Sequence, residues 1–293
     1  MINGVLNINK PKGYTSHDIV NIVRKHFNTK KVGHTGTLDP NATGVLPLCL
    51  GKATKLSSFI MGSDKIYRAV LILGISTDTQ DITGKILNEL SVNLTKKEIE
   101  DVINSFVGEI EQIPPMYSAI KIGGKKLYEL ARKNIEIERQ PRKVIIHNIK
   151  ILKFLKSNEI EIEVHCTSGT YIRTLCNDIG EKLKCGATMG DLIRIKSSIF
   201  TIENSIEISK LENLTKEALI MPNDIFENYK NLIVKDNFYN FLKNGNALYP
   251  YQIKDIPYLE NGEIVKIFSM CNTFFGLYKW ESEMLKVLVY IGA

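Results

Sequence analysis

A single carboxylate stands in a loop-like stretch near the start of the chain. Asp39 lies within GHTGTLDPNATG (residues 33–44), which is rich in Gly and Thr and contains no second acid and no Cys. An Asp followed by Pro often serves as a turn or capping residue, and for an arbitrary LDP sequence that explanation is the simpler one. A lone carboxylate can also act as a nucleophile or stabilise developing positive charge. Other segments of the sequence must decide between these roles.

Two nearby patterns do not match the ligand sites that they suggest. A phosphate-binding P-loop needs G-x-x-x-x-G-K-[ST], whereas Gly51 and Lys52 are followed by Ala53 and have no Gly at the required spacing before them. The segment TDTQDITG (residues 77–84) lacks the alternating acids and the closing Glu of a calcium-binding EF-hand loop. A polar turn after a strand is the expected structure of that segment.

The histidine spacing does not indicate a metal site. None of the histidines forms an H-E-x-x-H or comparable pair, and we expect no metal and no cofactor. His147 and His165 lie in strand patterns, where a core or sheet-surface role is the default. His34 adjoins the Asp39 loop, and its spacing fits a turn residue or a flat ring that stacks on a base about equally. The remaining two are His17 and His26.

Composition is that of an ordinary globular protein with a modest basic excess. The chain has 293 residues, 44% hydrophobic and 24% charged, with a net charge of +6. Such a charge is compatible with a polyanionic partner without proving one. The five cysteines are scattered, which is typical of reduced thiols. There is no signal-peptide pattern and no apolar run of ~18 residues, so we expect a cytoplasmic protein that does not bind membranes.

Hydrophobic periodicity predicts a strand-rich chain of the α+β class. Helices are expected at residues 15–27, 94–108 and 170–186, with Thr15 or Ser16 capping the first, a Thr95–Glu98 capping box in the second and Gly186 ending the third. The order is no regular βαβα series, so a mixed sheet is predicted. Strands are expected at residues 4–11, 30–35, 45–50, 64–74, 141–155, 159–166 and 192–200.

The composition changes near residue 228. The segments EIVKIFSM, TFFGLYKW and LKVLVYIG beyond that point read as short strands. We therefore predict a large domain over residues 1–228 and a small β-rich domain over residues 229–293.

A basic segment, KIGGKKLYELARKNIEIERQPRK (residues 121–143), lies within the large domain. A solvated helix and loop is the usual explanation of such a run. The more specific explanation is a protruding arm that contacts nucleic-acid phosphates, because Tyr128 is interleaved with the basic residues. The candidate RNA-binding residues of this arm are Lys121, Lys125, Lys126 and Arg132.

Several segments together resemble the TruB family, the bacterial tRNA pseudouridine-55 synthases. The matching text includes INGVLNINKPKGYTSHD, GHTGTLDPNATGVLPLCLGKATK, SDKIYRA, TDTQDITG, EQIPPMYSAIKIGGKKLYELAR and HCTSGTYIRTLCNDIGEKLKCGA, and it covers most of residues 1–200. The resemblance implies the pseudouridine synthase fold, a mixed and mostly antiparallel sheet flanked by helices. It also implies a PUA-like RNA-binding domain at the C-terminus, mainly from position and length.

The implied reaction converts a uridine in the TΨC loop of tRNA, at position 55, to pseudouridine. The C1′–N1 bond breaks, the base turns, and a C1′–C5 bond forms. There is no net oxidation or reduction, and no group enters or leaves, which agrees with a chain that has no nucleotide loop and no metal-ligand spacing.

The resemblance assigns roles to individual residues. Asp39 matches the catalytic aspartate, and Arg173 in GTYIR matches the arginine that pairs with it. Tyr67 in KIYR matches a tyrosine that stacks on the target base and is a candidate base for the C5 proton. Other matched residues are Tyr171 and Leu192 in the substrate pocket, His34 at the RNA near the vacated base position, and the structural Lys10 and Pro11.

Three functional hypotheses follow. The first is a stand-alone tRNA uridine isomerase that acts as a monomer without an obligatory protein partner. The second is a guide-RNA-dependent relative that works in a multi-protein particle, although such relatives usually carry long basic extensions that this chain lacks. The third is a non-catalytic RNA-binding or tRNA-folding module, which would tolerate loss of Asp39, Tyr67 or Arg173.

Overall fold

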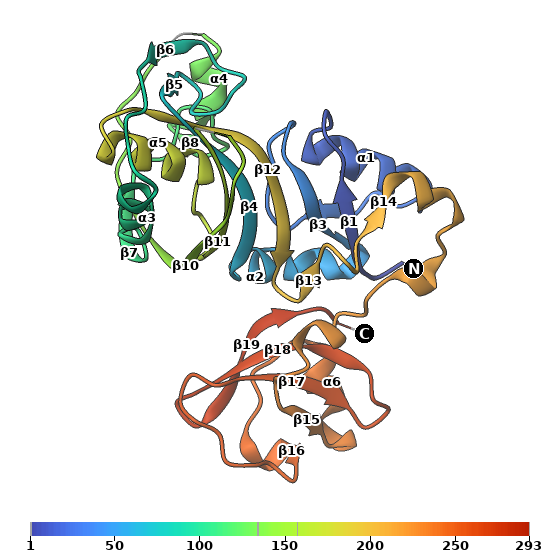
Figure 1. Ribbon diagram of the computed structural model, residues 1–293. Helices are drawn as coiled ribbons and strands as arrows, with labels where there is room; N and C mark the ends of the chain where they lie inside the picture. The colour runs from blue at the N-terminus through green and yellow to red at the C-terminus, as the bar shows by residue number, and fades with distance from the viewer. Residues whose placement is uncertain (1, 134, 157, 293) are drawn as a thin grey trace.

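A large mixed sheet runs through the first two thirds of the chain. The computed structural model describes residues 2–133, 135–156 and 158–292. The strands of this sheet are β1 Gly4–Lys10, β2 Val32–His34, β3 Thr43–Leu50, β4 Lys65–Leu73, β7 Gly108–Gln112, β10 Arg142–Phe154, β11 Glu159–Cys166, β12 Ala187–Ser197, β13 Phe200–Thr201 and β14 Ile206–Glu207. They are arranged in the order β14-β1-β3-β12-β4-β11-β10-β7, with β2 beside β3 and β13 beside β12 (Figure 1).

Most neighbouring strands in this sheet are antiparallel, and the exceptions are β1 with β14 and β3 with β12. The α+β prediction and the expected mixed, mostly antiparallel sheet flanked by helices are therefore confirmed.

A helix forms within each of the three predicted ranges, but the third ends at Lys182 and not at Gly186. Thr15, rather than Ser16, caps the first helix, and its hydroxyl accepts a hydrogen bond from the Asp18 amide. Thr95 and Glu98 form the expected capping box. Asp18 completes a second capping box with Thr15, and both boxes satisfy amides that the first helical turn leaves unpaired. The helices are α1 Ser16–His26, α2 Ser57–Met61, α3 Lys96–Asn104, α4 Leu127–Ala131, α5 Ile172–Lys182 and α6 Tyr239–Lys243.

Strand β11 shows how the sheet is covered on one face. Its residues alternate between buried and half-buried, and Ile162 and Val164 belong to the same core cluster as Leu175 and Ile179 of α5. Burial of each such side chain stabilises the fold by about 1.5–3 kcal/mol. The opposite face of β11 carries three glutamates and His165. α5 is thereby fixed against the sheet, and it carries Arg173 in its first turn.

One predicted strand was wrong in its bounds. The sequence favoured a single strand over residues 192–200, but β12 begins at Ala187 and ends at Ser197. Ser198 has a φ of +58°, and the chain reverses there into β13. A serine in the left-handed region is uncommon, so periodicity alone did not indicate the turn.

Two short hairpins extend from the large sheet. β5 Ile75–Thr77 pairs with β6 Ile86–Glu89, and β8 Lys121–Ile122 pairs with β9 Lys125–Lys126. The second hairpin turns at Gly123 and Gly124, both with positive φ, and leads directly into α4. It forms the start of the basic segment 121–143, in which residue 134 lies outside the described residues.

The predicted β-rich C-terminal part is confirmed as a second sheet. Its strands are β15 Asn231–Val234, β16 Ile253–Lys254, β17 Ile264–Ser269, β18 Phe274–Glu281 and β19 Met284–Tyr290, in the order β16-β15-β17-β18-β19. This sheet has its own core around Val265 and Phe275. Another apolar cluster joins it to the large sheet and includes Val45, Leu277 and Ile291. Figure 1 shows the second sheet in orange to red, below α2 and β13.

The connecting segments contain short 3-10 helices. They are η1 Gly51–Leu56, η2 Ile208–Asn213, η3 Lys216–Ala218, η4 Asp224–Phe226, η5 Asp236–Phe238 and η6 Pro250–Gln252.

Candidate active site

The loop that carries Asp39 is held in place by the N-terminal segment. It connects β2 to β3, and Ser16 at the start of α1 fixes its centre with two hydrogen bonds. The Ser16 hydroxyl donates to the Leu38 carbonyl at 3.0 Å and accepts from the Leu38 amide at 2.9 Å. The fully buried Lys10 donates its ammonium to the Pro40 carbonyl at 3.1 Å. Asp39 therefore lies between two anchored residues.

Lys10 has its positive charge inside the protein. Its ammonium also donates to the carbonyls of Pro11 and Tyr14. Burial lowers the pKa of Lys10 to about 8, and the nearby Asp39 carboxylate opposes that change. Lys10 remains protonated at neutral pH and helps to balance the charge of Asp39.

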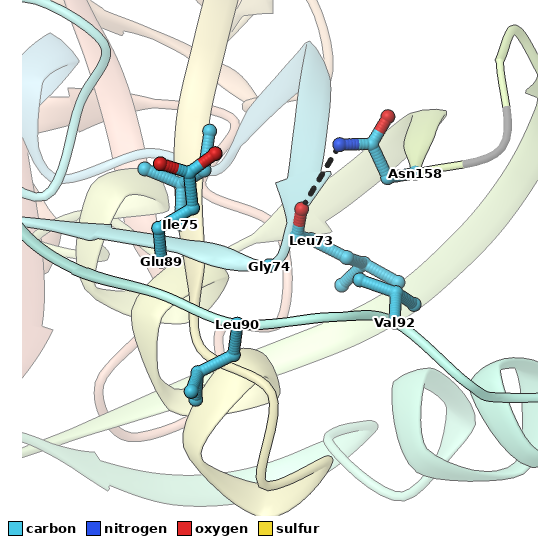
Figure 2. A pocket seen from close by; sticks show the side chains of 7 residues that line it. All are labelled: Leu73, Gly74, Ile75, Glu89, Leu90, Val92 and Asn158. Atoms are coloured by element: carbon cyan, nitrogen blue, oxygen red, sulfur yellow. Dashed lines mark hydrogen bonds between the residues drawn. The ribbon is translucent and has the colours of Figure 1, made fainter.

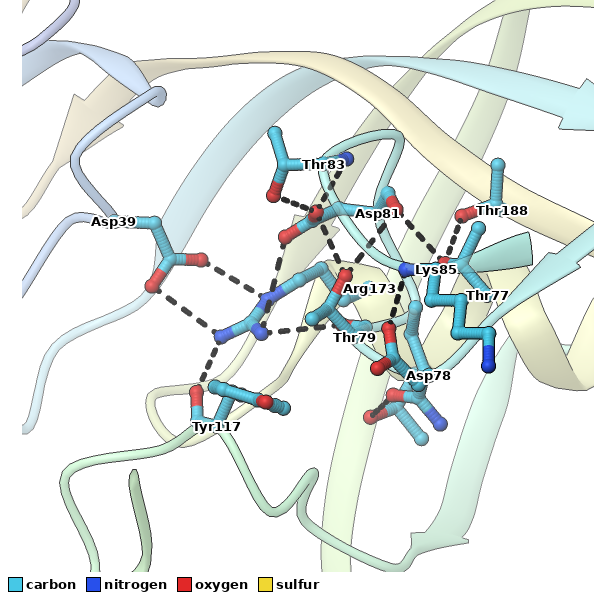
Figure 3. Close-up of polar contacts among 12 residues, drawn as sticks. Asp39, Thr77, Asp78, Thr79, Asp81, Thr83, Lys85, Tyr117, Arg173 and Thr188 are labelled. Atoms are coloured by element: carbon cyan, nitrogen blue, oxygen red, sulfur yellow. Dashed lines mark hydrogen bonds and ion pairs between the residues drawn. The ribbon is translucent and has the colours of Figure 1, made fainter. Parts of the chain in front are cut away.

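Arg173 binds Asp39 through two atoms. The Arg173 Nε lies 3.0 Å from Asp39 Oδ2, and Nη2 donates to Oδ1 at 3.3 Å. Figure 3 shows the guanidinium facing the carboxylate from the opposite side of the site. A paired guanidinium and carboxylate fix each other's orientation as well as their charge.

Two loops that are far apart in the sequence supply backbone carbonyls that bind Arg173. Its Nη2 donates to the Tyr117 carbonyl at 2.8 Å, and its Nη1 donates to the Thr79 carbonyl at 3.3 Å. Asp81 Oδ2 lies 4.0 Å from Nη1. The loop between β5 and β6 and the segment that precedes the β8–β9 hairpin therefore converge on this arginine (Figure 3).

The environment of Asp39 has opposing effects on its pKa. Burial raises the pKa of Asp39, the Arg173 guanidinium lowers it, and the Asp81 carboxylate raises it, so that the net direction is upward from its ordinary value. Its side chain is still 38% exposed, compared with 6% for Arg173. Asp39 is thus the member of the pair that an external substrate can reach.

Tyr67 lies on β4 between two neighbouring strands. In the sheet it is opposite Val164 of β11 and Arg194 of β12. Burial raises the pKa of Tyr67, and the Arg194 charge partly opposes this, so the phenol is neutral at neutral pH. Because Asp39 also contributes to the raised pKa of Tyr67, the two side chains share one electrostatic environment.

Arg194 links the tyrosine strand to the aspartate loop. It is almost fully buried, and its guanidinium donates to the carbonyls of Val45 at 2.7 Å and Gly36 at 3.1 Å. Gly44 has a φ of +101°, and a Cβ there would lie 2.3 Å from the Arg194 carbonyl oxygen. Only glycine allows this close approach of β3 and β12.

The two expected pocket residues, Tyr171 and Leu192, lie close in the sequence to Arg173 and Arg194. Tyr171 is the residue before α5, and its amide and carbonyl both bond to the Gln112 side chain. Burial raises the pKa of Tyr171, to which Asp39 also contributes. Leu192 is buried on β12, opposite Ala69 of β4.

His34 lies at the end of β2, ahead of the Asp39 loop. Its Nδ1 accepts a hydrogen bond from the Gly36 amide at 3.4 Å. Burial and the Arg194 charge lower the pKa of His34 below its ordinary value, so the ring is uncharged at neutral pH. It therefore offers a flat neutral surface rather than a cation.

The four basic arm residues are separate from the Asp39–Arg173 pair. Lys121, Lys125 and Lys126 lie on the β8–β9 hairpin, and Arg132 follows α4. The Tyr128 ring has the Lys126 ammonium at 5.3 Å and the Arg132 guanidinium at 5.4 Å from its centre. The arm reaches the active site through Tyr117, which lies just before the hairpin.

Sequence reasoning missed Asp81, Tyr117 and Arg194. Asp81 lies in TDTQDITG, which was interpreted as a polar turn, although the same segment matched the family. Arg194 is a charged residue in the middle of an apolar strand, LIRI, and that was the available signal. Tyr117 acts through its carbonyl, for which no side-chain pattern exists.

Two cavities lie away from this site. One of about 220 Å³ lies where β4 ends, and none of the candidate residues lines it (Figure 2). The other, of about 510 Å³, carries no carboxylate among its described lining residues. Its basic residues are Arg24, Lys30, Lys31, Lys52 and Lys55.

Among the described residues, no group of three His, Cys, Asp or Glu side chains at the Asp39–Arg173 pair could hold a metal ion. The same residues include no helix that is both long and apolar enough to cross a membrane.

Comparison with known proteins identifies the family. The model of the TruB family pseudouridylate synthase N-terminal domain matches residues 24–172, and that of the tRNA pseudouridylate synthase B C-terminal domain matches residues 173–229. The chain belongs to the TruB family. The border between the two matches falls in the first turn of α5, so both matched segments contribute to one sheet.

Full-length relatives agree with the TruB assignment. The tRNA pseudouridine synthase B of Alkaliphilus oremlandii is 50% identical, with 91% of this chain and 90% of the relative covered. That of Clostridium tetani is 46% identical, with 98% and 99% covered.

Solved structures share the TruB-type fold. A chain in a Cbf5-Nop10-Gar1 complex has a TM-score of 0.73 at 26% identity, with 98% of this chain and 84% of that chain covered. A chain in an H/ACA RNP bound to a substrate RNA containing 2′-deoxyuridine has a TM-score of 0.74 at 24% identity, with 99% and 85% covered.

Proposed function

We propose that the protein converts a uridine in the TΨC loop of tRNA, at position 55, to pseudouridine. The observation that carries this proposal is the half-exposed Asp39 carboxylate, oriented by the buried Arg173 guanidinium at 3.0 Å. The similarity to tRNA pseudouridine synthases B along nearly the full chain supports the same reaction.

Asp39 is the reacting group in this proposal. The C1′–N1 bond breaks, and positive charge develops at C1′ as the base leaves. A carboxylate beside C1′ stabilises that charge or bonds to the reacting carbon. The base then turns and C5 joins C1′, so every atom of the substrate is kept and neither a cofactor nor a metal is needed. Burial raises the pKa of Asp39, and the Arg173 guanidinium opposes this rise and so favours the ionised carboxylate.

Tyr67 receives the flipped base and the C5 proton. A uridine inside a folded RNA loop must leave its stack before C1′ can be reached. The Tyr67 ring offers a stacking surface, with Tyr171 and Leu192 as further walls of the pocket. The raised pKa of Tyr67 keeps its phenol neutral. The phenol oxygen therefore accepts the C5 proton as its own proton passes to solvent, and in this role it is a weak base. A weak base is sufficient, because loss of the C5 proton restores the conjugated ring. His34, uncharged, fills the gap that the base leaves.

Basic surfaces outside the pocket bind the RNA backbone. Lys121, Lys125, Lys126 and Arg132 form an arm that contacts phosphates. The arm follows Tyr117, whose carbonyl binds Arg173. The division into a catalytic domain over residues 1–228 and a PUA-like RNA-binding domain over residues 229–293 is part of this proposal. The protein acts as a monomer in the cytoplasm, without an obligatory protein partner.

Purified protein and an unmodified tRNA transcript test this function. We expect pseudouridine at the target position without added protein or guide RNA. Conversion that requires a guide RNA or protein partners would favour the guide-dependent alternative instead. Binding without conversion at any enzyme concentration would favour the RNA-binding or tRNA-folding module.

A further inference from the structure

Three side chains that can bind metals meet on the exposed face of the large sheet. His147 Nε2 lies 3.0 Å from Asp64 Oδ2, and His165 Nε2 lies 3.7 Å from the same oxygen. The two imidazole rings are 4.7 Å apart between their centres. Among the described residues, this is the one group of three such side chains whose ligand atoms all lie within 4.8 Å of one another.

An irregularity in β10 creates this arrangement. Ile146 pairs with Cys166 and Asn148 with His165, so His147 is an extra residue on its strand. Such a bulge redirects a side chain. Both His147 and Asn148 are exposed as a result, and the His147 ring lies beside His165 of the neighbouring strand. Sequence spacing could not reveal this pair, because its members lie on different strands.

Asp64 is brought to the pair by the start of β4. Its neighbour Lys65 is opposite Cys166, and Ile66 is opposite His165. The Asp64 carbonyl accepts a hydrogen bond from the Ser198 amide at 3.2 Å, which fixes the backbone there. The Lys65 ammonium is turned away and donates to the carbonyls of Met61 and Ser63. The carboxylate is therefore available to the two histidines.

We propose that Asp64, His147 and His165 form a binding site for a divalent first-row transition metal such as Zn²⁺ or Co²⁺. Zinc binds imidazole nitrogen and carboxylate oxygen at about 2.0–2.2 Å, which places tetrahedral ligands about 3.4 Å apart. The distances from Asp64 Oδ2 to His147 Nε2 and His165 Nε2, 3.0 and 3.7 Å, lie on either side of that value. Imidazole ligands favour these metals over Mg²⁺ or Ca²⁺, which prefer oxygen.

Solvent supplies the remaining ligands. The side chains of Asp64, His147 and His165 are 47%, 35% and 42% exposed. A metal with three protein ligands and an open position keeps water there. The site lies on the other face of the sheet from Tyr67, because Tyr67 is opposite Val164 and successive residues of β11 point to opposite faces. The bound ion joins β4, β10 and β11 without entering the uridine pocket.

Titration with Co²⁺, followed by visible absorption and by competition with Zn²⁺, tests this site. The protein is prepared without an affinity tag and with Cys271→Ser, which removes the exposed thiol as an alternative ligand. We expect one Co²⁺ per chain with micromolar affinity and displacement by Zn²⁺. His147→Ala, His165→Asn and Asp64→Asn are each expected to weaken binding by at least about tenfold.

His17→Ala removes an exposed histidine outside the group and serves as the matched control, with binding unchanged. Zn²⁺ is expected to raise the melting temperature of the parent protein by about 2 °C or more and to leave the His147→Ala, His165→Asn double variant unchanged. Absence of saturable binding by the folded parent would overturn the site. Equal affinity of the double variant would do the same. Neither result bears on uridine conversion, because neither measurement uses RNA.

Discussion

Arg173 is nearly buried while its partner Asp39 is partly exposed, and this asymmetry assigns different tasks to the two residues. Three oxygens besides the carboxylate lie around the guanidinium, those of Tyr117, Thr79 and Asp81. In the proposed reaction, Arg173 therefore orients Asp39 and balances its charge, while Asp39 faces the substrate. A lone carboxylate is sufficient here because the reaction needs one nucleophile or charge stabiliser and no second acid.

Arg173→Lys tests the electrostatic part of that division. The raised pKa of Asp39 means that its reactive form is lost as pH falls through a higher value than for an ordinary Asp. The Arg173 guanidinium opposes this rise of the Asp39 pKa. A Lys side chain cannot bind the carboxylate through two atoms as Arg does. We expect the acid limb of single-turnover rate against pH to move to higher pH, besides a lower plateau. A lower plateau with an unmoved limb would show that Arg173 does not act through Asp39 ionisation.

Tyr67→Phe separates stacking from proton transfer. Phe keeps the ring face but lacks the oxygen that would take the C5 proton. RNA affinity is expected to stay near that of the unchanged protein, and product formation to fall by about 100-fold or more. Binding and pseudouridine content are measured on the same RNA. Near-normal turnover would mean that another group accepts the proton.

At the scale of elements, local signals predicted α1, α3 and α5, but not the short α2 and α6. Caps depend on residues within one turn, so the sequence narrowed the first cap to Thr15 or Ser16 and predicted the Thr95–Glu98 capping box. The contacts of the active site could not be predicted from local signals. Thr79 and Tyr117 contribute backbone carbonyls to Arg173, and no residue type marks a carbonyl that will be used. Asp39, Tyr67 and Arg173 could be named only because their motifs resemble a family.

The chain reversal at Ser198 and the bulge at His147 were not predictable for a related reason. Each is a local change of backbone direction imposed by strand pairing. At both places the polar and apolar alternation is interrupted by two adjacent polar residues, His147 with Asn148 and Ser197 with Ser198. Such an interruption does not tell a bulge or a turn from a strand with polar residues on both faces.

The β8–β9 hairpin is the element expected to make the binding salt-dependent. Replacing Lys125, Lys126 and Arg132 together by Gln removes charge at the arm and leaves the buried Leu127 and Ala131 in place. We expect weaker tRNA binding and a shallower slope of log affinity against log salt concentration. A matched control replaces Lys97, Lys153 and Lys156 by Gln at other exposed positions. An unchanged slope in the arm variant would remove the hairpin from the interface.

At the scale of the whole molecule, the second sheet is packed onto the first. Leu277 and Ile291 share an apolar cluster with Val45 and Phe200 of the large sheet. Removing residues 229–293 would therefore expose apolar surface of the remaining part. We expect the truncated chain to melt at least about 5 °C lower and to bind tRNA more weakly. It should still convert saturating RNA, since no candidate catalytic residue is lost. A stable truncated chain with normal affinity but no conversion would contradict this division of tasks.

The most direct test of the account is single-turnover conversion by Asp39→Asn. Asn has nearly the same shape, keeps the turn, and removes a charge whose burial is unfavourable, so folding is expected to survive. Arg173 retains the carbonyls of Tyr117 and Thr79. RNA affinity should also survive, because phosphate contacts lie elsewhere. With excess enzyme, pseudouridine in the target loop, detected by chemical labelling, is predicted to be absent. Turnover within about tenfold of the unchanged protein, a barrier difference of only ~1.4 kcal/mol, would contradict a catalytic role and leave Asp39 a turn residue.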